Sequence, residues 1–101
     1  MKTDYYRHVT EKCPETFILW YSKKNYPKNL YWLLAKNYSK FFHTWFHKDS
    51  FPADDYKYLA VYCAENCNTW FDVNIFPKKD YYFLNMHCKK YEHIWNPQKR
   101  I

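Results

Sequence analysis

Two pairs of residues in this chain have a spacing that could bind a metal ion. His43 and His47 stand four residues apart in the stretch FFHTWFH, and Cys63 and Cys67 repeat that spacing twenty residues later. Imidazole nitrogens and thiolates are ligands that zinc prefers, and residues four apart lie on one face of a helix. The chemistry to test first is therefore a shared His2Cys2 zinc site.

The helices that would carry these pairs argue against such a site. On a helix spanning residues 27–47, His43 and His47 point away from the apolar stripe, whereas Cys63 and Cys67 lie at the centre of the stripe on the next helix. Zinc holds its ligands at about 2.0–2.3 Å, which this arrangement does not allow. We expect no metal site and no cofactor. The histidine pair alone could bind a transition metal only weakly.

The cysteines fit a structural role better than a redox role. Cys63, Cys67 and Cys88 each lie on an apolar stripe, where free cysteine behaves as a small hydrophobic residue. We expect these three to be buried and reduced, and Cys13 to be the one near the surface. The sequence shows no signal segment and no apolar run long enough to span a membrane. This favours a cytoplasmic location.

No combination of residues predicts catalysis. The chain contains no glycine, which excludes phosphate-binding loops and nucleophile elbows that need glycine. Asp54 and Asp55 fit the start of a helix better than acid–base work. His87 and Cys88 are neighbours on a helix, so they point about 100° apart. We expect that the protein is not an enzyme.

The elements that position these residues are predicted from prolines and apolar spacing. Pro14, Pro27, Pro52 and Pro77 each precede a segment with helical periodicity, and Pro97 follows the last one. The sequence predicts a single all-α domain, residues 1–101, folded as a compact bundle of four or five short antiparallel helices with little or no β structure. The expected helices span residues 3–12, 14–24, 27–47, 52–71 and 77–95.

No long internal repeat is predicted. The segments KKNYPK and AKNYSK resemble each other, but so short a match is expected by chance in a chain rich in Lys, Asn and Tyr. This composition, poor in Gly, Ala and Arg, is typical of an AT-rich coding sequence such as that of a phage or another mobile element.

The positive charge is concentrated in the first half of the chain. The formal net charge is +6, and the segment from Lys12 to Lys48 contains seven lysines and one acidic residue, Glu15. A basic half of a chain indicates an acidic partner, although a surface that only keeps the protein soluble has the same pattern. The residues predicted to bind the partner are Lys36, Lys40, His43 and His47 on one exposed helix face, Trp32 at the border of that face, and Lys23, Lys24 and Lys28.

The function predicted from these features is binding, with two alternatives for the partner. A quarter of the residues are aromatic, more than a small core readily buries, and Tyr and Trp are enriched at protein interfaces. The first expectation is a non-catalytic accessory subunit or inhibitor that docks on a larger protein or nucleoprotein with an acidic surface. The alternative is a nucleic-acid-binding protein that uses phosphate contacts and stacking on Trp32. The histidines would strengthen either surface below about pH 6.5.

Overall fold

The fold is all-α, which confirms the predicted class. The structure is a computed structural model that describes residues 2–96, and within this range it contains short helices and no β-strand. Pro97, the predicted stop after the last helix, lies outside the described residues.

The chain divides into two units, with the boundary between Phe51 and Pro52. The prediction of a single domain stays a prediction. Unit 1 contains α1 (Lys2–Lys12), η1 (Pro14–Thr16), α2 (Phe17–Trp20), η2 (Lys28–Leu30), α3 (Tyr31–Asn37), η3 (Ser39–Phe41) and α4 (Phe42–Trp45), where η denotes a 3-10 helix. Unit 2 contains η4 (Ala53–Asp55), α5 (Tyr56–Tyr62), η5 (Ala64–Asn66), α6 (Cys67–Trp70), η6 (Lys78–Asp80), α7 (Tyr81–His87), η7 (Lys89–Tyr91) and α8 (Glu92–Trp95).

The order of these elements repeats every 25 residues, so the prediction of no long repeat is wrong. From Pro27, Pro52 and Pro77 the chain forms a 3-10 turn, a seven-residue α-helix, a break, a second 3-10 turn and a four-residue α-helix. We number the repeats 1 to 4, starting at residues 2, 27, 52 and 77. In repeat 1 the continuous helix α1 replaces the first 3-10 turn and α-helix. A tryptophan recurs at the same position in each repeat: Trp20, Trp45, Trp70 and Trp95.

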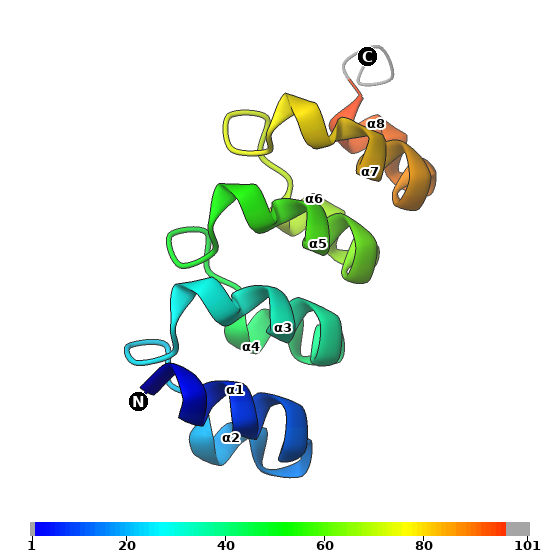
Figure 1. Cartoon of the computed structure of the whole chain (residues 1–101). Helices are drawn as coiled ribbons and strands as arrows, with labels where there is room; N and C mark the ends of the chain where they lie inside the picture. The colour runs from blue at the N-terminus through cyan, green and yellow to red at the C-terminus, as the bar shows by residue number, and fades with distance from the viewer. Residues whose placement is uncertain (1, 97–101) are drawn as a thin grey trace. The chain divides into compact units, whose positions relative to one another are not determined.

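The break inside each repeat divides the long helices that the sequence predicts. The predicted helix 27–47 is interrupted at Tyr38, which has φ −129° and ψ 34°, and Cys63 and Cys88 interrupt repeats 3 and 4 in the same way. The N–H of Tyr38 still donates to the carbonyl of Leu34 at 2.8 Å, which closes the first helix. Each repeat is therefore a pair of helices joined by a 3-10 turn, and in Figure 1 α1 lies beside α2 and α5 beside α6.

The recurring tryptophan holds this break in place. The indole N–H of Trp45 donates to the carbonyl of Tyr38 at 2.7 Å, and the same bond recurs seven residues apart in every repeat. The equivalent bonds run from Trp20 to Cys13, Trp70 to Cys63 and Trp95 to Cys88, at 2.9, 2.7 and 2.9 Å. Each of these carbonyls also accepts the backbone N–H three residues later, so the indole supplies a second donor while its ring fills the core.

Within each unit the two repeats are joined by an equivalent hydrogen bond. The Tyr38 hydroxyl donates to the carbonyl of Thr10 at 2.7 Å in unit 1, and the Cys88 thiol donates to the carbonyl of Ala60 at 3.5 Å in unit 2. Both bonds span 28 residues and accompany the packing of α1 on α3 and of α5 on α7. Adjacent repeats in a unit thus pack with the same register.

The loops between repeats need no glycine. The carbonyl of Ser22 accepts N–H groups from Asn25 and Tyr26, and the carbonyl of His47 accepts those of Ser50 and Phe51. No residue in the described part of the chain has a positive φ. The missing glycine therefore has no structural cost here, since left-handed backbone is what most often requires it.

A transmembrane role finds no support among the described helices. None of those within residues 2–96 combines the length and the apolar character that crossing a bilayer requires.

Candidate functional site

The predicted basic residues lie on several segments of unit 1 and not on one helix. Lys36 is in the last turn of α3, Lys40 in η3 and His43 in α4, while His47 lies in the loop after α4. The prediction of one helix face shared by these residues is therefore wrong, because the break at Tyr38 interrupts the angular progression on which it depends.

Most of the predicted site residues are exposed as expected, although they do not lie on one helix face. Lys36, Lys40 and His43 are exposed, whereas His47 and Trp32 are half-buried. Within residues 2–96, no hydrogen bond, ion pair or ring contact links Lys36, Lys40 or His43 to one another. The ring of His43 packs edge-on against its neighbour Phe42 instead, with 5.2 Å between centroids.

The structure does bring Lys23 and His47 together. Tyr21, which precedes the first inter-repeat loop, shares a 2.8 Å hydroxyl hydrogen bond with Tyr31 and donates at 3.4 Å to the carbonyl of Trp45 at the end of α4. These bonds place the loop of repeat 1 beside the start of the loop of repeat 2.

The pKa of His47 is consistent with these two loops lying close together. Burial lowers the pKa of His47 below its ordinary value of 6.5, the positive charge of Lys23 lowers it further, and Asp49 opposes both. A like charge lowers a histidine pKa only where it is near. We call the residues Lys23, Lys24, Lys28 and His47 the basic loop surface; the three lysines are exposed.

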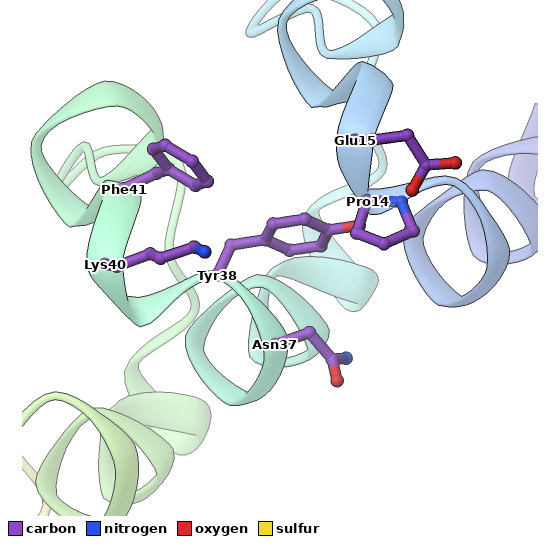
Figure 2. A pocket seen from close by; sticks show the side chains of 6 residues that line it. All are labelled: Pro14, Glu15, Asn37, Tyr38, Lys40 and Phe41. Carbon is purple, nitrogen blue, oxygen red and sulfur yellow. The ribbon is translucent and has the colours of Figure 1, made fainter.

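A second feature of unit 1 is a pocket of about 380 Å³ between the two repeats. Figure 2 shows the Tyr38 ring between Pro14 and the side chain of Lys40. Phe41 forms a wall, and its ring lies 5.4 Å from the Lys40 ammonium, a cation–π contact. The lining residues are Pro14, Glu15, Asn37, Tyr38, Lys40 and Phe41.

The cysteines occupy the core, as predicted for three of them. Cys63, Cys67 and Cys88 are buried and Cys13 is half-buried. Burial raises the pKa of the Cys63 thiol to about 12. A hydrogen bond with Cys88, together with burial, raises the pKa of Cys67. The thiols of Cys63 and Cys67 are therefore protonated at neutral pH and poor nucleophiles, whereas the hydrogen bond with Cys67 lowers the pKa of Cys88.

No metal-binding cluster is found where the structure describes the chain. Within residues 2–96, no three His, Cys, Asp or Glu side chains gather closely enough to hold an ion.

The tyrosines near the basic loop surface are also unsuited to proton transfer at neutral pH. Burial and the hydrogen bond with Tyr31 raise the pKa of Tyr21.

Comparison with known proteins adds no functional information. No protein-family model matches this chain, and neither a curated protein nor a solved structure is similar to it.

Sequence reasoning missed the pocket and two exposed apolar residues of α2. Ile18 and Leu19 on α2 are 77% and 84% exposed, and neither was a predicted site residue. The signal that could have identified them is the 25-residue period. At the equivalent positions of repeat 2 stand His43 and Thr44, so an apolar pair is unusual there.

Proposed function

We propose that this protein is a non-catalytic helical-repeat protein that docks on an acidic surface of a larger protein, as an accessory subunit or an inhibitor. The docking site is the basic loop surface of unit 1. The observation that carries the proposal is the exposure of Lys23, Lys24 and Lys28 in the basic half of the chain. The lowered pKa of His47, caused first by burial and then by Lys23, supports it. Repeat proteins built from packed helix pairs commonly bind other proteins through surfaces that extend over several repeats.

The distribution of charge supports the choice of unit 1. Residues 1–51 contain nine Lys and Arg against four Asp and Glu, whereas residues 52–101 contain seven against six. A concentrated positive surface accelerates association with an acidic partner and orients it. Lys36 and His43, exposed elsewhere on unit 1, stay predicted contacts. The four free cysteines fit a reducing, cytoplasmic compartment.

Nucleic acid is the second candidate, and two observations weigh against it. Trp32, the predicted stacking residue, is half-buried, which limits the ring face available to a base. Asp49 lies close enough to act on His47, and a carboxylate there repels phosphate. Lysine also outnumbers arginine by fourteen to two, which disfavours reading of base edges.

Paired charge reversals test the proposal. The variant K23E/K24E changes two adjacent exposed lysines of the basic loop surface, and K78E/K79E makes the same change in unit 2. Each tagged variant and the wild type are mixed with cell extract, with and without nuclease, and the bound proteins are quantified by mass spectrometry. Surface substitutions of this kind usually change stability by about 0.5 kcal/mol or less, so the fold should persist.

The expected result is a stoichiometric protein that survives nuclease, binds wild type and K78E/K79E equally, and is lost with K23E/K24E. Its binding should weaken as salt rises. Loss of all bound material after nuclease treatment would favour the nucleic-acid alternative. Equal recovery by K23E/K24E and wild type would show that the basic loop surface is only a solvated surface.

A further inference from the structure

Two buried thiols meet between the two repeats of unit 2. Cys67 is the first residue of α6 in repeat 3, and Cys88 directly follows α7 in repeat 4. The Cys67 thiol donates a hydrogen bond to the Cys88 sulfur, and the Cys88 thiol donates to the carbonyl of Ala60 at 3.5 Å. Both cysteines are fully buried. This chain of hydrogen bonds therefore holds the two sulfurs in contact beside α5.

The same two positions are in contact in unit 1, where they carry aromatic rings. Phe17 of repeat 1 is equivalent to Cys67, and Tyr38 of repeat 2 is equivalent to Cys88. The rings of Phe17 and Tyr38 are stacked, with 4.9 Å between their centroids. Each pair lies next to the hydrogen bond that spans 28 residues between adjacent repeats. The contact between the two thiols therefore follows from the register in which these repeats pack.

Apolar packing alone does not require two cysteines at this contact. In unit 1 two large rings fill the equivalent position, so side chains without any reactive group can join two repeats there. A single buried cysteine acts as a small hydrophobic residue. Two cysteines in contact add a reaction, because a disulfide forms where the side chains already point toward each other. Cys67 and Cys88 meet that requirement through their hydrogen bond.

We propose that Cys67 and Cys88 are a redox pair, which a small disulfide such as oxidised glutathione converts into a disulfide bond joining repeat 3 to repeat 4. In the reduced protein these repeats are joined by packing of α5 on α7 and by the hydrogen bond to Ala60. Oxidation replaces a separable contact with a covalent bond. The inference concerns unit 2 and does not depend on the proposed docking site in unit 1.

The reaction takes place in two thiol–disulfide exchanges. The Cys88 thiolate first attacks one sulfur of oxidised glutathione, whose S–S bond breaks, and one glutathione leaves and takes up the proton that Cys88 released. Cys67 then loses its proton and attacks the Cys88 sulfur of the mixed disulfide, and the second glutathione leaves with that proton. Two protein thiols are oxidised and one small disulfide is reduced to two thiols, so atoms and electrons balance.

Cys88 attacks first because the hydrogen bond from Cys67 stabilises its thiolate. This bond lowers the pKa of Cys88 although burial opposes it, whereas the pKa of Cys67 is raised. Both sulfurs are buried, so the oxidant reaches them only when repeats 3 and 4 separate locally. Oxidation should therefore be slow, and the disulfide should then prevent the same separation.

Equilibration of the full chain in glutathione buffers, followed by peptide mass spectrometry, tests the inference. The protein is incubated at a series of ratios of reduced to oxidised glutathione until the products stop changing, and the remaining thiols are alkylated in denaturant. Cys67 and Cys88 should lose reactivity together, and their peptides should be linked. Cys13 and Cys63 should stay open to alkylation. The oxidised protein should also unfold at a higher urea concentration than the reduced protein.

Single substitutions separate a redox pair from two cysteines that only fill space. Cys67→Ala should stop the reaction after the first exchange, so that one glutathione stays attached to Cys88. Cys88→Ala should form no link. The matched control is Cys63→Ala, which removes another buried thiol of repeat 3 and should shift the midpoint ratio by about twofold or less. Circular dichroism of each variant shows whether it folds.

Three results would overturn the inference: a wild-type protein whose thiols all stay reduced at the most oxidising ratio, a link that joins Cys63 to either cysteine of the pair, or a link between two copies of the chain. The connectivity of the wild-type protein decides each of these, so the test holds even if a variant fails to fold. Fragmentation of the linked peptides distinguishes Cys63 from Cys67.

Discussion

The indole N–H of Trp70 donates a 2.7 Å hydrogen bond to the backbone carbonyl of Cys63, seven residues earlier, at the point where one helix of repeat 3 ends and the next begins. That carbonyl also accepts the N–H of Asn66 at 3.0 Å. Trp70 is fully buried. The buried ring and the indole hydrogen bond therefore support this turn together with the backbone hydrogen bond from Asn66.

Replacing Trp70 with Phe should therefore destabilise the protein while keeping an aromatic ring in the core. The Cys63 carbonyl keeps the N–H of Asn66 as a donor, so loss of the indole hydrogen bond should cost about 0.5–1.5 kcal/mol, and the smaller ring adds a packing loss. Urea unfolding followed by circular dichroism measures the change. Trp32→Phe is the control, because Trp32 is half-buried and lies outside the 25-residue period. An equal loss in both variants would mean that the Trp70 bond has no special role.

The pKa of His47 should lie below 6.5 in the free protein and rise when Lys23 is replaced by Met. Burial is the larger cause of the lowered pKa, so removing the Lys23 charge should reverse only part of it. Lys24→Met should have less effect, since Lys24 is not among the groups that act on His47. Titration of the imidazole carbon-bound protons by NMR measures each pKa. An unchanged pKa in Lys23→Met would show that the two loops are not close.

The same lowered pKa predicts how stability and binding respond to acid. Because the unfolded chain takes up a proton at His47 at a higher pH than the folded chain does, the His47 contribution to the free energy of unfolding is present above pH 6.5 and is lost as pH falls through the folded pKa. A partner carboxylate beside His47 would raise its pKa again, so docking should take up a proton and strengthen as pH falls. Calorimetry in buffers of different ionisation enthalpy detects that uptake. His47→Gln should abolish it.

Thiol labelling should separate the cysteines by their burial. Cys13 is half-buried and should react first with a maleimide under native conditions, whereas Cys63, Cys67 and Cys88 should react only on unfolding. The raised pKa of Cys63, about 12, leaves almost no thiolate at neutral pH. Mass spectrometry of labelled peptides over time gives the rates. Fast labelling of all four cysteines would contradict the buried placement.

The sequence predicted helix content well and helix continuity poorly, for a physical reason. Leu34, Tyr38, Phe41 and Trp45 follow one another at steps of three and four, which both an α-helix and a 3-10 turn allow. The apolar stripe therefore continues across the break at Tyr38 without a signal. The signal for the break was the 25-residue spacing of Trp and Pro, which a search for local helical spacing does not detect.

For the candidate site, the sequence predicted which residues are exposed but not which of them lie together on one surface. Lys36, Lys40 and His43 are exposed, as a polar pattern on a helix predicts. Their grouping depended on a continuous helix, and the break removed it. The approach of Lys23 to His47 could not be predicted because it depends on Tyr21 bonding to Tyr31 and Trp45, contacts between segments distant in the sequence.

The absence of glycine, together with the absence of positive φ angles in residues 2–96, has a consequence for the unfolded chain. A glycine gives the unfolded backbone more conformations than any other residue, and an average chain of this length contains about seven. Replacing a glycine by a residue that fits the native backbone stabilises a protein by about 0.4–1 kcal/mol, largely by lowering the entropy of the unfolded state. These short helices therefore form from a chain whose disorder is already restricted, which compensates for the small core that each repeat can build.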